Sequence, residues 1–156
     1  LISITGKIGI KNLSFIGLYV PSRGPKERKN EDKKKFQTLV EKSLPRIMTK
    51  KQNIIVGGDL NVIERNHIPK YAIFGDWEYN FYDSFSKRKL NDAFRLLNPT
   101  INDHSWFGRS GNGYRFDHFF VSGDIKPKIL SCNYIHQPRI NKLSDHSIML
   151  MKIAKY

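Results

Sequence analysis

The length of the chain, 156 residues, is close to that of one ordinary domain. A domain of this size buries roughly 68–70% of the surface that its unfolded chain exposes, which is enough for a hydrophobic core. Lysine and arginine number 27 and aspartate and glutamate 14, so the formal net charge is +13 at pH 7. Such an excess favours a polyanionic partner, although a charged surface that only keeps the protein soluble would look the same.

Cysteine content and hydropathy exclude two classes of protein. Cys132 is the only cysteine, so no internal disulfide can form and a disulfide-stapled secreted domain is excluded. No apolar run approaches the roughly 20 residues that a membrane-spanning helix needs, and the first residues do not resemble a signal region. We therefore expect a soluble, cytoplasmic protein that does not bind membranes.

The first quarter of the chain predicts two strands followed by a helix. Residues 1–5 and 13–20 are rich in β-branched and aromatic side chains and are separated by turn-favouring residues, which indicates a hairpin or two adjacent strands. From about residue 30 apolar residues recur at helical spacing, which predicts an amphipathic helix. Pro45 lies inside this helix and is expected to kink or break it.

The middle of the chain predicts a strand, a long loop and two short helices. Residues 53–57 form a short apolar run, typical of a buried strand that delivers Asp59 into the next loop. Residues 64–77 show no sustained period and predict an irregular loop. Apolar spacing over residues 81–97 predicts helix, interrupted by polar residues at 88–91.

Strands dominate the predicted C-terminal half. Residues 105–107 and 114–122 read as strands on either side of a glycine-rich loop at 108–113. Two further strands are expected at 129–134 and 147–154. No repeat, low-complexity tract or linker divides the chain, so we expect residues 1–156 to form a single domain.

Three acidic segments could carry chemistry. Asp59 and Asn61 follow two glycines at a strand end, where ordinary turn chemistry is the alternative. Asp117 lies in an apolar strand and needs a partner, unless that strand is an edge whose carboxylate faces water. The pair Asp145-His146 could simply be a capped turn. Together they suit metal-assisted phosphoester cleavage, in which water is activated and an imidazolium contacts the phosphate.

Four segments in this order carry a family resemblance. They are residues 17–21 (Gly-Leu-Tyr-Val-Pro), 58–61 (Gly-Asp-Leu-Asn), 106–107 with 114–117 (Trp-Phe and Tyr-Arg-Phe-Asp), and 144–146 (Ser-Asp-His). The chain thereby resembles the endonuclease/exonuclease/phosphatase superfamily, and within it the exonuclease III and abasic-site endonuclease branch. The resemblance implies an α/β fold of deoxyribonuclease type, a two-sheet sandwich with helices outside. It also implies phosphodiester hydrolysis of DNA that depends on Mg²⁺ or Mn²⁺.

The resemblance implies a role for each matching residue. Asp59 would position or deprotonate the attacking water, and Asn61 would hydrogen-bond the phosphoryl transition state. His146, oriented by Asp117, would contact the scissile phosphate. The implied catalytic residues are Tyr19, Asp59, Asn61, Asp117 and His146, with Asp145 as metal ligand.

Aromatic and basic residues are the implied substrate contacts. They are Arg23, Trp106, Arg109, Tyr114 and Arg115. The aromatic residues, with Phe107, flank the loop that in related nucleases faces the sugar or an extruded base, although ordinary core packing is the alternative for Phe107 and Tyr114. A basic cluster could follow a nucleic-acid backbone or be only a solvated helix start: Lys26, Arg28, Lys29, Lys33, Lys34 and Lys35.

The chain departs from the family pattern at its beginning. Family members carry, before the segment that matches Tyr19, a strand ending in Asn and a Glu that is the main metal ligand, and this chain has neither there. We therefore expect a partial domain: a fragment, a chain completed by an N-terminal segment or an oligomeric partner, or a decayed remnant. Glu27, Glu64 and Glu78 are the candidates to replace the missing Glu, with exposed loop or surface charge as the alternative.

The sequence and its family resemblance leave three candidate functions. The first is a DNA nuclease of repair type that hydrolyses phosphodiesters with a divalent metal. The second keeps fold and metal but acts as a phosphatase or phosphodiesterase on small phosphoesters. The third is a noncatalytic nucleic-acid-binding protein, which would show salt-sensitive binding without Mg²⁺-dependent cleavage.

Overall fold

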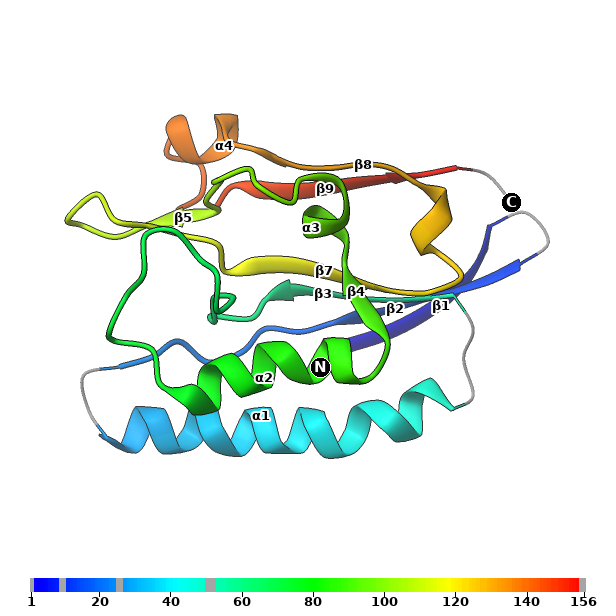
Figure 1. Cartoon of the computed structure of the whole chain (residues 1–156), viewed down its shortest axis with the longest axis horizontal. Helices are drawn as coiled ribbons and strands as arrows, with labels where there is room; N and C mark the ends of the chain where they lie inside the picture. Colours follow the sequence, from blue (N-terminus) through cyan, green and yellow to red (C-terminus); the bar gives the residue numbers. More distant parts are fainter. Residues whose placement is uncertain (1, 9–10, 25–26, 50–52, 155–156) are drawn as a thin grey trace.

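A five-stranded sheet forms the centre of the molecule, between two long helices on one face and a two-stranded sheet on the other (Figure 1). The computed structural model describes residues 2–8, 11–24, 27–49 and 53–154. In spatial order the central strands are β1 (Ile2–Ile8), β2 (Lys11–Gly17), β3 (Ile54–Asp59), β7 (Asp117–Ser122) and β4 (Leu90–Asp92). The predicted α/β fold, with two sheets packed together and helices outside, is confirmed.

The remaining elements cover or flank this sheet. The helices are α1 (Glu27–Met48), α2 (Asp76–Lys87), α3 (Ala93–Leu97), α4 (Gln137–Ile140) and the 3-10 helix η1 (Lys126–Lys128). Two small sheets pair β5 (Trp106–Phe107) with β6 (Gly113–Tyr114), and β8 (Ile129–Ile135) with β9 (Ile148–Ile153). The short helices η1 and α4 were not predicted from the sequence.

Strand β3 is buried on both faces, which explains its continuous apolar sequence. Ile54 and Val56 pack with side chains of α1 and α2 in one core. Ile55 points the other way and packs with residues of α3 and β8 in a second core. Because both faces are covered, the strand is held firmly up to its polar end at Asp59.

The pairing of the central strands sets up the candidate site. β1 and β2 form the predicted antiparallel hairpin, and β2 runs parallel to β3, which follows it after α1. β3 and β7 are antiparallel, and their register places Asp59 directly opposite Asp117. Two carboxylates that are 58 residues apart in sequence, 117 − 59, are thereby neighbours.

Pro45 was expected to kink or break helix α1; the helix continues through it and ends three residues later, at Met48, so it is not broken there. Proline has no N–H, so the carbonyl of Glu41 loses its usual donor four residues on. The guanidinium of Arg88, at the end of α2, donates to that carbonyl at 3.0 Å. A contact from a neighbouring helix end thus takes the place of the missing intrahelical bond.

Two predicted segments differ in detail from the structure. The strand expected over 114–122 is split at Arg115 and Phe116, so that β6 and β7 belong to different sheets. The backbone N–H groups of Phe116 and Asp117 donate to Ser105 Oγ instead of to a strand partner. The two predicted short helices are present, but the residues between them include strand β4, which pairs with β7.

Apolar side chains remain exposed on β1, the edge strand of the five-stranded sheet, and on β9. Ile2 and Ile4 are 68% and 63% exposed, and Ile148 is 51% exposed. This agrees with the expectation that a partial domain leaves apolar strands uncovered. Within the described part of the chain, no helix combines the length and apolar character needed to cross a membrane.

Candidate active site

Two strands and a loop bring three ionisable side chains together. Asp59 ends β3, Asp117 begins β7, and His146 lies in the loop just before β9. His146 Nδ1 lies 2.7 Å from Asp117 Oδ2, and its Nε2 lies 4.0 Å from Asp59 Oδ2. A ligand atom from each of the three lies within 4.8 Å of the others, so together they could hold a metal ion.

Asn61 fixes the orientation of Asp59. Its backbone has φ of 49°, a left-handed conformation that Asn tolerates better than most residues. Its backbone N–H donates to Asp59 Oδ1, and its side-chain amide donates to Asp59 Oδ2, both at 2.8 Å. The same amide also donates to the carbonyl of Val20 at 2.9 Å. In this geometry Asn61 orients the carboxylate, and its contact with a phosphoryl group stays a prediction.

The surroundings shift the pKa values of the two central groups upward. Burial, together with the nearby charge of Asp117, raises the pKa of Asp59 to about 6, although the Asn61 N–H and the charges of His146 and Lys33 oppose this. The hydrogen bond to Asp117 raises the pKa of His146 above its ordinary value. At neutral pH Asp59 can therefore act as a base while the imidazolium form of His146 is favoured.

Asp59 and His146 line a cleft of about 490 Å³, whereas Asp117 contacts His146 without lining this cleft. Among the described lining residues, Arg23 is the only lysine or arginine. Tyr19, which is 72% exposed, also lines the cleft. Aromatic rings form another wall, with Tyr114 and Phe116 stacked at 5.1 Å between centroids. The described lining residues are Tyr19, Ser22, Arg23, Asp59, Asn61, Ile73, Phe74, Trp106, Tyr114, Phe116, Asp145 and His146.

Most of the sequence-predicted site residues therefore meet at one place. Asp145 lies at the cleft wall, where its carboxylate accepts a hydrogen bond from Trp106 Nε1 at 3.3 Å, but it is outside the three-residue cluster. Its role as a metal ligand stays a prediction. Arg109 is exposed in the loop between β5 and β6 and does not line the cleft.

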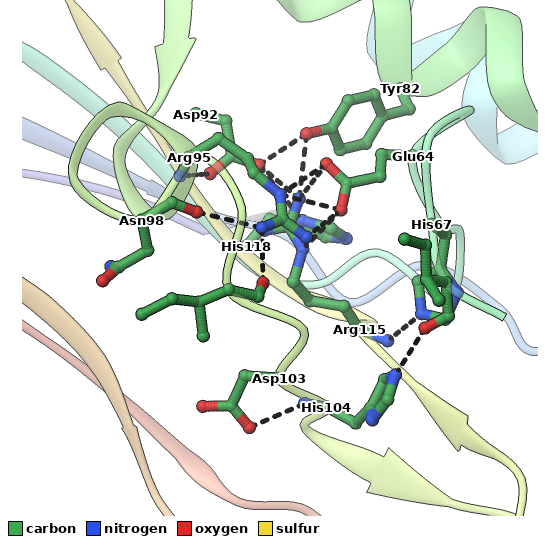
Figure 2. A network of polar contacts seen from close by, with 12 residues as sticks. Glu64, His67, Tyr82, Asp92, Arg95, Asn98, Asp103, His104, Arg115 and His118 are labelled. Atoms are coloured by element: carbon green, nitrogen blue, oxygen red, sulfur yellow. Dashed lines mark hydrogen bonds and ion pairs between the residues drawn. The ribbon is translucent and has the colours of Figure 1, made fainter.

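Arg115 lies inside the protein, so its predicted contact with substrate is wrong. Its side chain is fully buried, and its Nη2 donates to Glu64 Oε2 at 2.9 Å and to Asp92 Oδ2 at 2.7 Å (Figure 2). Tyr82 and Arg95 join the same network, in which both carboxylates are bound by guanidinium groups. Arg115 thus neutralises buried carboxylates and ties the residues before β7 to β4 and to the loop after β3.

The described candidates for the missing metal-binding Glu are occupied elsewhere. Glu64 is paired with Arg95 and Arg115, and Glu78 with Arg23 and Lys33. Neither joins the Asp59 cluster, so these two replacements are wrong. The side chain of Glu27 lies outside the described residues.

The basic cluster expected to follow a nucleic-acid backbone is only partly available. Lys33 is fully buried, so its side chain cannot contact a nucleic-acid backbone at the protein surface. Lys34 and Lys35 are exposed on α1, and Lys34 pairs with Glu31 at 3.0 Å. Lys26 and the side chains of Arg28 and Lys29 lie outside the described residues.

Sequence reasoning missed two groups of residues around the site. Phe74 and Phe116 line the cleft, although Phe74 belongs to a loop without periodicity. Lys33, considered above only as a surface charge, donates to the backbone of Asn61, 28 residues away in sequence. Of these residues, only Phe116 could have been indicated by the sequence, because it directly precedes the predicted site residue Asp117.

Known proteins resemble this chain in structure but not detectably in sequence. No family model matches the sequence, and no curated protein matches it. The 3′ phosphatase NExo from Neisseria, solved with a product DNA hairpin, matches with a TM-score of 0.81 and 17% identity, over 90% of this chain and 61% of that one. An AP endonuclease from Archaeoglobus fulgidus matches with a TM-score of 0.80 and 20% identity, over 97% and 64%. The catalytic domain of APE2 from Xenopus laevis matches with a TM-score of 0.72 and 18% identity, over 94% and 52%.

The chain has the fold of exonuclease III-type nucleases. The predicted resemblance is confirmed at this level, because the matches cover nearly the whole chain. The chain spans only 52–64% of the length of these solved nucleases, as expected for a partial domain of this fold. The shared fold makes the carboxylate and imidazole cluster the natural focus of a functional proposal.

Proposed function

We propose that this chain carries the catalytic part of a divalent-metal-dependent phosphodiester hydrolase that acts on DNA. The observation that supports this most directly is the cluster of Asp59, Asp117 and His146 at the edge of a cleft that also presents an arginine. A base, a hydrogen-bond donor and a metal-binding set at one position are what phosphodiester hydrolysis requires.

The residues of the chain divide the work of such a reaction. Asp59, held by Asn61 and with a pKa of about 6, would receive the proton of the attacking water. His146 would donate a hydrogen bond from Nε2 to a nonbridging phosphate oxygen, while Asp117 holds its Nδ1. Arg23, which also lines the cleft, would bind the phosphate charge.

The donor set fits Mg²⁺ or Mn²⁺. Asp59 and Asp117 offer carboxylate oxygens, the ligand type that suits both ions. In the proposed reaction both ring nitrogens of His146 act as donors, to Asp117 and to the phosphate, so the carboxylates would hold the ion. Asp145 is proposed as a further ligand from the cleft wall. When bound, the ion would stabilise the negative charge that develops on the phosphoryl group.

DNA is the proposed substrate because charge and cleft shape favour it. The net charge of +13 attracts a polyanion, and the aromatic wall offers ring faces on which a base or sugar can pack. NExo, which shares the fold, is a 3′ phosphatase solved with a DNA hairpin. A DNA 3′ end is therefore included among the substrates to test.

A second candidate function is noncatalytic DNA binding. The specific observation in its favour is that no acidic side chain beyond Asp59 and Asp117 joins the His146 cluster among the residues that the structure describes. A site with few carboxylates binds a hard divalent cation weakly. Binding without cleavage would then be the whole activity.

The experiment that tests the proposal is cleavage of labelled DNA. We expect the protein to act on a duplex with an abasic site, an intact duplex or a hairpin with a 3′ phosphate, in Mg²⁺ or Mn²⁺ but not in EDTA. Asp59→Asn should lower the rate by roughly 10²–10⁴-fold, the usual contribution of a positioned base, with little loss of stability. Asp124→Asn, at an exposed turn, is the matched control.

Other results of this experiment would contradict the proposal or favour a different function. Equal rates for wild type and Asp59→Asn would reject Asp59 as the base. Salt-sensitive binding without metal-dependent cleavage would support the noncatalytic function. Turnover of a soluble phosphoester with weak DNA affinity would indicate an enzyme for small substrates.

A further inference from the structure

Lys33 is a buried lysine that contacts the backbone of Asn61, a residue of the candidate site. Its side chain has 0% exposure, which is rare for a lysine. Nζ donates to the backbone carbonyl of Asn61 at 2.7 Å and to Glu78 Oε1 at 2.7 Å. A buried ammonium without partners would cost several kcal/mol, so these two contacts are what keep it in place.

The carbonyl of Asn61 is the end of the turn that carries Asp59. The other polar groups of Asn61 are engaged with Asp59 and Val20, as described above. Leu60 N also donates to the carbonyl of Phe116 at 2.9 Å, which ties the turn to the segment before Asp117. Lys33 adds an anchor from α1, so the turn is held from the helix side as well as from the sheet.

Glu78 is the second partner of the Lys33 ammonium group. Its side chain also has 0% exposure, and Oε2 accepts from the Gly75 N–H at 3.0 Å, at the start of α2. The same carboxylate is bound by Arg23, the arginine of the cleft. The ring of Trp77 lies beside both cations, 5.7 Å from Lys33 Nζ and 6.0 Å from Arg23 Cζ.

The buried ion pair of Lys33 and Glu78 thus connects two residues that line the cleft, Asn61 and Arg23. We infer that Lys33 is a positioning residue for the proposed reaction: through Asn61 it holds the carboxylate of Asp59 in place, and through Glu78 it is linked to Arg23. This inference rests on the proposed function. Groups that orient a reacting residue commonly affect activity by 10–100-fold although they never touch the substrate.

The test compares Lys33→Met, which keeps the length of the side chain and removes its charge, with Lys42→Met on the exposed side of the same helix. We expect Lys33→Met to lower kcat on the cleaved DNA roughly 10–100-fold with KM changed less than about twofold. Lys42→Met should leave both unchanged. A purely structural role would lower the folded fraction without changing kcat per folded molecule.

Hydrogen exchange separates this inference from the proposed function. Backbone amides of residues 60–62 should exchange at least about tenfold faster in Lys33→Met than in wild type, beyond any change elsewhere in the chain. That readout needs no catalysis, so it decides the inference even if the wild type cleaves nothing. If Lys33→Met does not fold, Lys33→Gln carries the same comparison.

Two results would overturn the inference. One is exchange at residues 60–62 that is unchanged, or that rises only as much as in the rest of the chain. The other is an unchanged kcat in a variant of an active wild type. Faster local exchange in the variant of an inactive wild type would uphold the positioning of the turn while the proposed nuclease function fails.

Discussion

Buried ionisable side chains in this protein behave differently according to the charge that faces them. Burial and Asp117 raise the pKa of Asp59 to about 6. Burial would raise the pKa of Asp92 as well, but the charge of Arg115 and the nearby imidazole of His118, whose Nδ1 lies 3.7 Å from Asp92 Oδ2, hold it well below its usual range. A carboxylate facing another carboxylate is poised to exchange a proton, whereas one facing an arginine stays ionised and structural.

His67 supplies a pH-dependent stability test at the residue scale. Burial lowers the pKa of His67 to about 4. The unfolded chain binds a proton below about 6.5 but the folded chain only near 4, so acidification through this window favours unfolding. At pH 4 the loss attributable to His67 should be about 3 kcal/mol.

The comparison that checks this is urea unfolding at pH 7, 5.5 and 4 for wild type and His67→Gln. Asp59 acts in the opposite direction, because its raised pKa makes the folded chain bind a proton first. The difference between the two proteins therefore isolates His67, since Asp59 is common to both. A stability gap that does not change from pH 7 to pH 4 would contradict the prediction.

Helix α1 is stabilised by a contact from outside itself. Pro45 leaves the carbonyl of Glu41 without its intrahelical donor, and Arg88 at the end of α2 supplies one. Local sequence rules predict the lost hydrogen bond but not the arginine 47 residues away that replaces it. The helix therefore continues through a proline at which its sequence predicts a kink or a break.

A double-mutant cycle tests this replacement. Arg88→Met should cost about 1 kcal/mol of unfolding free energy for each hydrogen bond that it removes, one to the carbonyl of Glu41 and one to that of Ser84. In a Pro45→Ala background the new N–H can serve Glu41, so the cost of Arg88→Met should be smaller. Urea unfolding of the four proteins measures the coupling, and equal costs in both backgrounds would show that the two positions act independently.

Across the whole molecule, net charge and the position of the cleft predict how the proposed DNA binding would depend on salt. Arg23 lies in the cleft and Lys34 is exposed on α1. Arg23→Ala and Lys34→Ala should each weaken binding of a DNA duplex uniformly across sequences and reduce the slope of log affinity against log salt by about 1. Fluorescence anisotropy over a salt series measures the slope, with Lys42→Ala as control. An unchanged slope for both variants would remove these residues from the DNA-binding surface.

The extent of the fold is also a property of the whole molecule. The chain matches solved nucleases over nearly its full length but spans only 52–64% of theirs. The exposed isoleucines of β1 and β9 agree with a fold of which further parts are absent from this chain. That residues 1–156 act as one partial domain, alone, as an oligomer or with a complementing segment, stays a prediction.

Local pattern in the sequence was enough to predict the main strands and helices, since periodicity and turn residues act over a few neighbours. It also indicated Asp59, Asp117 and His146 as candidates for one site, because each stands at the end of an apolar strand or beside one. Only the tertiary structure decided which charged groups face the cleft. Arg115, Lys33, Glu64 and Glu78 all read as available surface charges, yet each is buried in an ion pair. Their partners lie 45 and 51 residues away, at distances that only the packing of α1, α2 and the sheet determines.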